Sequence, residues 1–315
     1  MQILSLTENL KMKSEQLEGA DRRAAVAIGK FDGIHAGHKK LLEEIINAKK
    51  QGMRAVVFTF DPSPEELFLG HKIPALCTKE EKRKRFAAYG IDELIEFPLS
   101  KESAAMEPVS FVQQILVEEL NAGLIVSGTD LTFGDRGRGN AETMQECAKL
   151  FDFSYRMIDK ICLGDQEISS TRIREAVKNG EMELAERMLL EPYSVTGEIV
   201  HGKHLGHQLL MPTINMIASK EKLLPPHGVY ASNVLIGEKK YRGITNIGFK
   251  PTVSNENRLG IETYLYDFTG DLYGTCAEVT LLHFMRREQK FPDLEALKKQ
   301  LGTDKQNGKL YFDAN

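Results

Sequence analysis

The chain has 315 residues, which is long enough for two domains that each bury a core of their own. Acidic residues outnumber basic ones by 45 to 41, so the formal net charge is −4 at pH 7. Because general nucleic-acid binding needs a basic surface, this balance argues against nucleic-acid partners and favours small phosphorylated ligands.

The sequence carries no recognisable targeting or membrane signal. Residues 1–10 include Glu8 and lack a basic start followed by an apolar core, and no apolar run approaches membrane-spanning length. We therefore expect a cytoplasmic protein without a membrane partner. The cysteines form no Cys-x-x-Cys pair and are expected to be reduced core residues: Cys77, Cys147, Cys162 and Cys276.

The first part of the chain alternates apolar strands with amphipathic helices. Strands are expected at residues 24–28, 54–60, 93–99 and 124–126, with helices after the first strand and at residues 111–120, 171–177 and 182–190. This alternation predicts a doubly wound parallel α/β sheet. The basic run at residues 79–85 is interpreted as the solvated face of a helix, because acidic residues interrupt it. The domain is placed at residues 1–190.

The rest of the chain, residues 191–315, has a different sequence pattern. Short strands separated by glycine, proline and asparagine are expected at residues 194–200, 228–236, 241–247, 261–268 and 276–284. This pattern is typical of a small antiparallel β-barrel. A charged helix at residues 294–301 closes the chain.

A His-x-Gly-His element lies between the first strand and the first helix, in the segment Gly29-Lys30-Phe31-Asp32-Gly33-Ile34-His35-Ala36-Gly37-His38. A helix N-terminus offers free backbone N–H groups and the positive end of the helix dipole. Gly33 and Gly37 allow close approach of the backbone, and the imidazoles of His35 and His38 can donate to phosphate oxygens. The element predicts a polyphosphate site, although two solvated histidines in a loop would give the same pattern.

Three further motifs follow in the same domain. They are Thr59-Phe60-Asp61-Pro62-Ser63-Pro64, Ser127-Gly128-Thr129-Asp130-Leu131-Thr132-Phe133-Gly134 and Ile168-Ser169-Ser170-Thr171-Arg172-Ile173-Arg174. In their order and spacing the four motifs resemble those of bacterial FAD synthetases, the bifunctional riboflavin kinase/FMN adenylyltransferase family. The resemblance implies a nucleotidyltransferase domain followed by a riboflavin kinase-like barrel.

The resemblance also implies roles for individual residues. It places His35, His38 and Arg172 among the catalytic groups, with the segment at Ser170 holding the triphosphate from the side opposite the histidines. The implied ATP-binding residues are Gly29, Phe31, Asp32, Gly33, Gly37, Ser170, Thr171 and Arg174. Ser170 can also serve as a plain helix cap, and Arg172 as the partner of a nearby acid.

The implied flavin pocket is formed by Phe60, Pro62, Asp130 and Phe133. Here the chain departs from the family, which usually has His in place of Ser63 and Phe in place of Leu131, so the departures bear on substrate affinity. The glycine-rich segment at residues 134–139 is either a mobile cover on this site or a plain turn.

The implied reaction joins FMN to ATP without a covalent enzyme intermediate. The FMN phosphate attacks the α-phosphorus of ATP and pyrophosphate leaves, with Mg²⁺ screening the anions. The protein is then expected to contribute alignment and electrostatic stabilisation rather than a general base.

The second domain resembles riboflavin kinases over nearly its full length, with the matching segments Pro212-Thr213-Ile214-Asn215, Thr245-Asn246-Ile247-Gly248 and Ile261-Glu262-Thr263. The resemblance implies that Thr213 and Asn215 hold Mg²⁺ and ADP and that Glu262 activates the ribityl hydroxyl of riboflavin. The alternative for Glu262 is a strand residue that faces water.

The nucleotide loop of this domain departs from the family pattern. His207, Leu210 and Ile214 replace the arginine, glycine and alanine that the family usually has. A side chain at Leu210 is expected to obstruct the phosphate, His207 is mostly neutral at pH 7, and Ile214 is expected to crowd the metal ligands. These changes predict a weak or silent kinase.

Several alternatives remain open. The chain is either an FAD synthetase with an impaired kinase, a fully bifunctional enzyme, or an adenylyltransferase whose barrel only binds flavin as a regulatory or docking module. Class I aminoacyl-tRNA synthetases lack support because no Lys-Met-Ser-Lys-Ser-like loop is present, and NAD-dependent oxidoreductases because no Gly-x-Gly-x-x-Gly opens the first helix. Homo-oligomer formation and transient contact with flavoproteins that receive FAD are left open.

Overall fold

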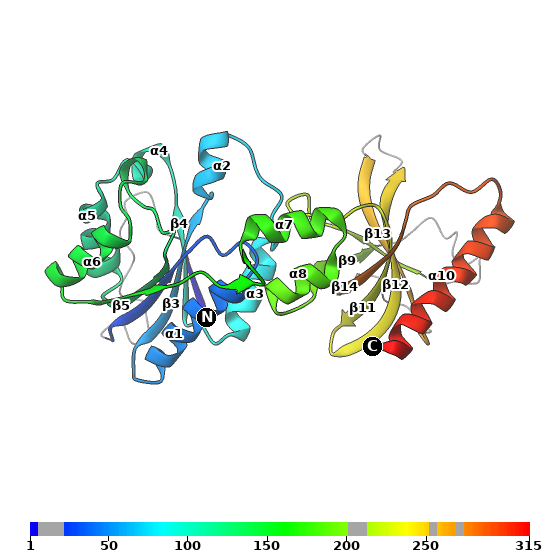
Figure 1. Cartoon of the computed structure of the whole chain (residues 1–315), viewed down its shortest axis with the longest axis horizontal. Coiled ribbons are helices and arrows are strands. Elements are labelled where there is room, and N and C mark those ends of the chain that lie inside the picture. The colour runs from blue at the N-terminus through cyan, green and yellow to red at the C-terminus, as the bar shows by residue number, and fades with distance from the viewer. Residues whose placement is uncertain (6–21, 201–212, 252–256, 269–271, 273) are drawn as a thin grey trace. The chain divides into compact units, whose positions relative to one another are not determined.

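A computed structural model describes residues 1–5, 22–200, 213–251, 257–268, 272 and 274–315 (Figure 1). The chain divides into two compact units, residues 1–169 and 170–315, and each unit is described by itself. The predicted domain boundary at residues 190/191 stays a prediction. No helix among the described residues has the length and apolar character needed to cross a membrane.

The first unit is built on a parallel sheet in the order β1-β4-β3-β2-β5-β6. Every neighbouring pair in this sheet is parallel, which confirms the predicted topology. Strand β2 lies between β3 and β5, and all of its residues are buried. The strands are β1 (Gln2–Ser5), β2 (Ala24–Ile28), β3 (Arg54–Asp61), β4 (Glu93–Pro98), β5 (Ala122–Gly128) and β6 (Ser154–Ile158).

Helices cover both faces of this sheet (Figure 1). Successive residues of β2 alternate between two apolar clusters. Ala25 and Ala27 pack with α1, whereas Val26 and Ile28 pack with the segment around Phe111. The doubly wound arrangement is therefore confirmed. The helices are α1 (Ala36–Lys49), α2 (Pro64–Leu69), α3 (Lys79–Ala88), α4 (Lys101–Ala104), α5 (Pro108–Phe111) and α6 (Ala141–Leu150).

Two short helical segments and a hairpin complete the first unit. The predicted helix at residues 111–120 is present, but from η2 (Val112–Glu119) onward it has π-helical winding. Segment η3 (Asp135–Gly137) is a 3₁₀ turn, and β7 (Cys162–Leu163) pairs with β8 (Gln166–Glu167).

The second unit is a closed barrel, as predicted, in the order β10-β13-β12-β11-β14-β9, preceded by α7 (Ser170–Asn179) and α8 (Met182–Leu189). Helix α8 packs on the barrel, and His283 of β14 lies 2.6 Å from Glu183 of α8. The strands are β9 (Tyr193–Val200), β10 (Thr213–Ile217), β11 (Gly228–Ile236), β12 (Lys239–Pro251), β13 (Asn257–Leu265) and β14 (Cys276–Arg287).

The C-terminal helix α10 (Leu294–Ala314) continues well past the predicted end at residue 301. Gly308 lies against Ile244 of β12, and a Cβ at Gly308 would collide with the Cδ1 atom of Ile244. Gly308 lies inside the helix, and its missing side chain lets the helix approach the barrel closely.

The cysteine prediction was right for two positions and wrong for two. Cys77 and Cys147 are buried, whereas Cys162 and Cys276 are exposed. Cys162 lies in the small β7–β8 hairpin and Cys276 begins β14, and both positions are outside the apolar clusters of the sheet and the barrel interior.

Candidate functional site

The His-x-Gly-His element is a compact structure at the start of α1. His35 is the N-cap of the helix, and its Nδ1 accepts a hydrogen bond of 3.4 Å from the backbone N–H of His38. The Nδ1 of His38 lies 2.9 Å from the carbonyl oxygen of Gly33, so Nδ1 carries the proton and donates. The two rings stack with centroids 3.8 Å apart. The histidines therefore form one unit with fixed tautomers.

Glycine is required at two positions of this loop. Gly33 has a positive φ of 70°, which side chains other than glycine adopt at a cost. A Cβ at Gly37 would lie 3.1 Å from Cε1 of His35, so a larger residue would press on the ring. The backbone at these glycines thus accommodates the two histidines, and close approach of the backbone to a phosphate stays a prediction.

Burial lowers the pKa of both histidines. His35 is 9% exposed, and desolvation lowers its pKa to about 4, although the Asp130 carboxylate counteracts part of the effect. Desolvation also lowers the pKa of His38 well below its ordinary value, and the charges of His35 and Lys82 lower it further. Both imidazoles are therefore neutral at pH 7 in the ligand-free protein.

Neighbouring strands support the loop. The hydroxyl of Thr59 donates to the carbonyl of Lys30 at 3.1 Å, and the backbone N–H of Leu76 donates to Asp32 at 2.8 Å. Asp32 thus ties the loop to the segment that precedes α3. This contact gives Asp32 a positioning role in the ligand-free structure, and its predicted contact with ATP stays a prediction.

The predicted flavin residues lie at the same edge of the sheet. Phe60 and Phe133 belong to one aromatic group around Phe111. The ring centroid of Phe111 lies 6.5 Å from that of Phe60 and 5.6 Å from that of Phe133. Phe133 is buried, whereas Pro62 and Asp130 are exposed. Phe60 and Phe133 therefore both pack near Phe111, and Phe133 has a core position. Their contact with flavin stays a prediction.

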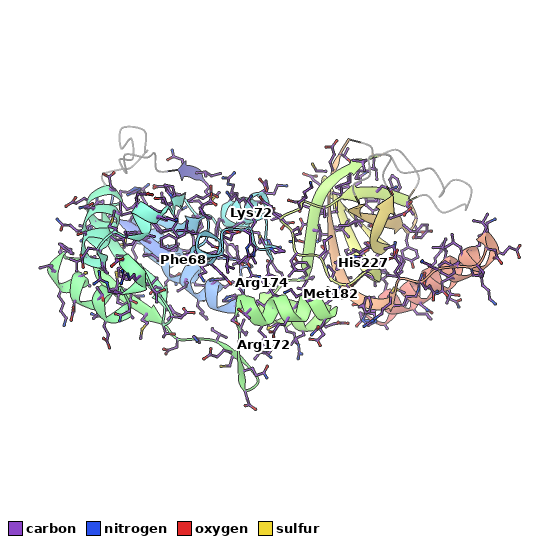
Figure 2. All side chains as sticks on the ribbon, turned by 90° about the horizontal axis from the view of Figure 1, so that it is seen from above. Phe68, Lys72, Arg172, Arg174, Met182 and His227 are labelled. Carbon is purple, nitrogen blue, oxygen red and sulfur yellow. The ribbon has the colours of Figure 1, made fainter. Side chains whose placement is uncertain are left out.

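Sequence reasoning missed Phe68, which lies on α2 directly after the Pro62-Ser63-Pro64 segment. Its ring is 76% exposed, and Figure 2 labels it. Leu69 beside it is also exposed. The signal was available in the sequence, because three large apolar residues, Leu67, Phe68 and Leu69, follow Pro64-Glu65-Glu66 and end the short helix that Ser63 caps.

The glycine-rich segment at residues 134–139 forms an ordered, hydrogen-bonded turn. The backbone groups of Phe133 and Gly139 bond to each other in both directions, at 3.0 and 2.9 Å. Asp135 pairs with Arg138 at 2.6 Å, and its N–H bonds to the carbonyl of Met106. These contacts favour the plain turn over the mobile cover.

The predicted triphosphate residues Ser170, Thr171, Arg172 and Arg174 lie in the first half of α7. Figure 2 labels both arginines on this helix. Ile173 between them is buried. The helix belongs to the second compact unit and the histidine loop to the first. The meeting of the two segments on one triphosphate stays a prediction.

The predicted kinase residues come together on the neighbouring strands β10 and β13, where Asn215 is buried. Asn215 of β10 lies opposite Glu262 of β13, and the hydroxyl of Thr213 donates to Oε1 of Glu262 at 2.7 Å. Glu262 is half-buried. The structure therefore contradicts the alternative in which Glu262 only faces water.

Asn246 extends this row and was not assigned a role from the sequence. It lies opposite Glu262 on β12, so Asn246, Glu262 and Asn215 occupy matching positions on three adjacent strands. Residues directly opposite each other share a face of the sheet. The sequence held a signal for this position: in a strand over Thr245-Asn246-Ile247, Asn246 faces the opposite side from its two neighbours, which are buried.

Buried hydroxyl groups link β11, β12 and β13 inside the barrel. Ser232, Thr245 and Thr263 are fully buried; the hydroxyl oxygens of Ser232 and Thr245 are 2.7 Å apart, and those of Thr245 and Thr263 are 2.8 Å apart. Each buried hydroxyl satisfies its neighbour, so the interior polar groups fix which residues of β12 and β13 face outward.

Ile214 is 7% exposed and lies between Thr213 and Asn215 on β10, so strand alternation directs its side chain to the opposite face of the strand from these two predicted ligands. This placement speaks against crowding of the metal ligands by Ile214, and the predicted effect stays a prediction. His207 and Leu210 fall in residues 201–212, outside the described residues.

Comparisons with known proteins agree on both halves of the chain. The FAD synthetase family model matches residues 17–172, and the riboflavin kinase family model matches residues 189–312. The bifunctional riboflavin kinase/FMN adenylyltransferase of Escherichia coli (strain K12) is 34% identical over 290 residues, which cover 91% of this chain and 92% of that protein.

Two further comparisons cover nearly the whole chain. The protein of the same description from Haemophilus influenzae is 32% identical over 314 residues, which cover 99% of this chain and 100% of that protein. The crystal structure of the macrolide-efflux protein from Streptococcus pneumoniae superposes with a TM-score of 0.84 at 28% identity, and the match covers 98% of this chain and 99% of that one.

Proposed function

We propose that this chain, which belongs to the bifunctional riboflavin kinase/FMN adenylyltransferase family, is an FAD synthetase that transfers AMP from ATP to FMN and releases pyrophosphate. The stacked pair His35 and His38 at the N-terminus of α1 is the observation that carries this proposal. It combines backbone N–H groups, a helix dipole and the Nε2–H donor of His35, which together suit a polyphosphate.

The proposed role of the site residues is to position the two substrates and to stabilise the charge on the leaving group. A phosphate oxygen of FMN attacks the α-phosphorus of ATP, the bond to the β-phosphate oxygen breaks, and pyrophosphate leaves. With Nδ1 of His35 accepting a backbone hydrogen bond, its Nε2 carries the proton and donates toward an anion. Arg172 and Arg174 are proposed to add positive charge beside the departing pyrophosphate.

The flavin is proposed to lie on the Phe60 and Pro62 side of the site. The exposed ring of Phe68 offers the isoalloxazine an aromatic surface beside Pro62. The carboxylate of Asp130 counteracts part of the lowering of the His35 pKa, which supports placing Asp130 near the histidine loop.

Magnesium fits the residues assembled on β10 and β13. Thr213, Asn215 and Glu262 offer hydroxyl, amide and carboxylate oxygens, and Mg²⁺ is held in this way by few protein ligands together with substrate phosphates. No group of three or more His, Cys, Asp or Glu side chains suited to a metal occurs among the described residues.

The kinase is proposed to be weak, because His207 and Leu210 replace an arginine and a glycine in the phosphate loop. A fully active kinase is the second candidate. It is supported by the assembled Thr213–Glu262 pair and by the bifunctional description of the relatives. A barrel that only binds flavin, homo-oligomer formation and contact with flavoproteins stay predictions.

Incubation of the pure protein with FMN and Mg-ATP tests the proposal. We expect FAD and pyrophosphate in equal amounts by chromatography and a coupled pyrophosphate assay. A parallel incubation with riboflavin and Mg-ATP measures the kinase. Absence of FAD from the first incubation would refute the proposed activity.

A further inference from the structure

The basic helix α3 differs from the solvated helix that the sequence predicted. Its residues Lys79 and Arg83 are both neutralised by carboxylates of the sheet. The Nζ atom of Lys79 lies 2.6 Å from Asp61, and the guanidinium of Arg83 binds Glu96 through two contacts of 3.1 and 2.5 Å. These two cations therefore hold α3 on the sheet.

Lys82 lies between them and has a different partner. Its Nζ atom is 3.4 Å from the backbone carbonyl of Lys30, within the histidine loop at residues 29–38. The side chain is half-buried, and no carboxylate of the described residues lies within ion-pair distance of it. Lys82 is thus a cation that faces the loop without being neutralised by an acidic side chain.

Packing fixes this placement. Phe86 of α3 makes an edge-to-face contact with Phe31 of the loop, with ring centroids 5.4 Å apart. Thr78 and Glu81 form a capping box at the start of α3. The helix therefore holds Lys82 beside the loop through contacts that do not involve the lysine itself.

The two histidines of the loop carry no positive charge at pH 7, and the other basic side chain of the loop, Lys30, is exposed. Burial keeps His35 and His38 neutral at pH 7, and Nδ1 of His38 donates to Gly33, which leaves Nε2 of neutral His38 as an acceptor. That atom therefore offers no N–H to a phosphate oxygen, and the donors of the loop are the backbone N–H groups and Nε2 of His35. A charged donor beside the loop would strengthen phosphate binding, and Lys82 is close enough for its charge to act on His38.

We propose that Lys82 is a phosphate-binding residue of this site, where its ammonium contacts the phosphates of ATP beside His35 and His38. The inference rests on the proposed adenylyltransferase function and deepens it. A lysine ammonium is a mobile point charge with three donors, and it can leave the Lys30 carbonyl for a phosphate oxygen at little cost.

The test is a titration of the full-length protein with inorganic pyrophosphate, followed by the ring resonances of His35 and His38 in NMR spectra. Lys82→Met is expected to weaken pyrophosphate binding about tenfold, and Lys82→Arg to keep it within about threefold of the wild type. Lys84→Met is the matched control, because Lys84 is an exposed lysine of the same helix.

A second readout excludes a merely structural role. Without ligand, Lys82→Met is expected to raise the pKa of His38, since a nearby positive charge is removed, while Lys84→Met leaves it unchanged. The inference is overturned if Lys82→Met binds pyrophosphate like the wild type, or if Lys84→Met weakens binding equally.

The outcome is separable from that of the proposed function. FAD formation by the wild type decides the adenylyltransferase activity, whereas pyrophosphate binding decides the role of Lys82. Binding that depends on Lys82 in a protein that makes no FAD would sustain this inference and refute the function.

Discussion

The hydroxyl of Thr213 lies 2.7 Å from Oε1 of Glu262, so a predicted metal ligand and the candidate base of the kinase site are hydrogen-bonded across β10 and β13. Glu262→Gln is expected to abolish FMN formation from riboflavin and to leave FAD formation from FMN unchanged, because the amide cannot take up a proton. The rate of FMN formation from riboflavin and the rate of FAD formation from FMN, each measured separately, test this expectation. Glu198→Gln, at an exposed site on β9, is the control, and equal kinase loss in both variants would contradict the role.

A variant that restores the family residues of the nucleotide loop needs changes at His207 and Leu210 and leaves Ile214 in place. His207→Arg with Leu210→Gly is expected to raise the kinase rate at least about tenfold, since a charged donor and an open backbone are regained. Adding Glu262→Gln should remove the gain. An unchanged rate in the double variant would mean that another feature limits the barrel, and the flavin-binding module would become the better account.

Ile214→Ala is expected to destabilise the barrel without helping the kinase. The side chain is buried in the interior, and its removal should cost about 2–4 kcal/mol of unfolding free energy. Urea titrations of the two proteins give this difference. A faster kinase with unchanged stability would show that Ile214 crowds the metal ligands after all.

His38→Asn is expected to lower kcat/KM for FAD formation about a hundredfold, because the amide keeps the donor to Gly33 but loses the ring that stacks on His35. His38 is only half-exposed, so His38→Ala would also remove packing. His71→Asn, at an exposed position, is the control and should keep full activity. Near-normal turnover of His38→Asn would refute the assigned role.

Stability should fall with acid more steeply in the wild type than in His35→Asn. The folded protein holds the pKa of His35 at about 4, whereas the unfolded chain has about 6.5. Between these values the unfolded state binds more protons, so the unfolding free energy decreases as pH falls through this window. Urea unfolding at pH 7 and pH 5 measures the difference. Identical pH dependence in both proteins would contradict the buried, neutral His35.

The fold was predictable where burial dictates composition. Residues 24–28 are all apolar because β2 is covered on both faces, and the alternation with helices fixed the parallel sheet. Strand β6 escaped prediction because it lies at the edge of the sheet, where Ser154 and Arg156 are tolerated. The π-helical winding of η2 leaves no periodic signal in eight residues.

The site was predictable where a motif is local. The loop around His35 and His38 is determined by its own glycines and by the helix that follows. The role of Lys82 was not visible, because its difference from Lys79 and Arg83 depends on Asp61 and Glu96, which reach α3 only in the folded sheet. By contrast, the inward direction of Ile214 follows from strand alternation alone and was available from the sequence once β10 was recognised.

The most direct measurement traces the atoms of ATP during the reaction with FMN. With ATP labelled at the α-phosphorus, the account predicts label in FAD, and with ATP labelled at the γ-phosphorus it predicts label in pyrophosphate and none in the flavin product. Label from the γ-position in a flavin product, or no α-label in FAD, would contradict adenylyl transfer as the reaction of this protein.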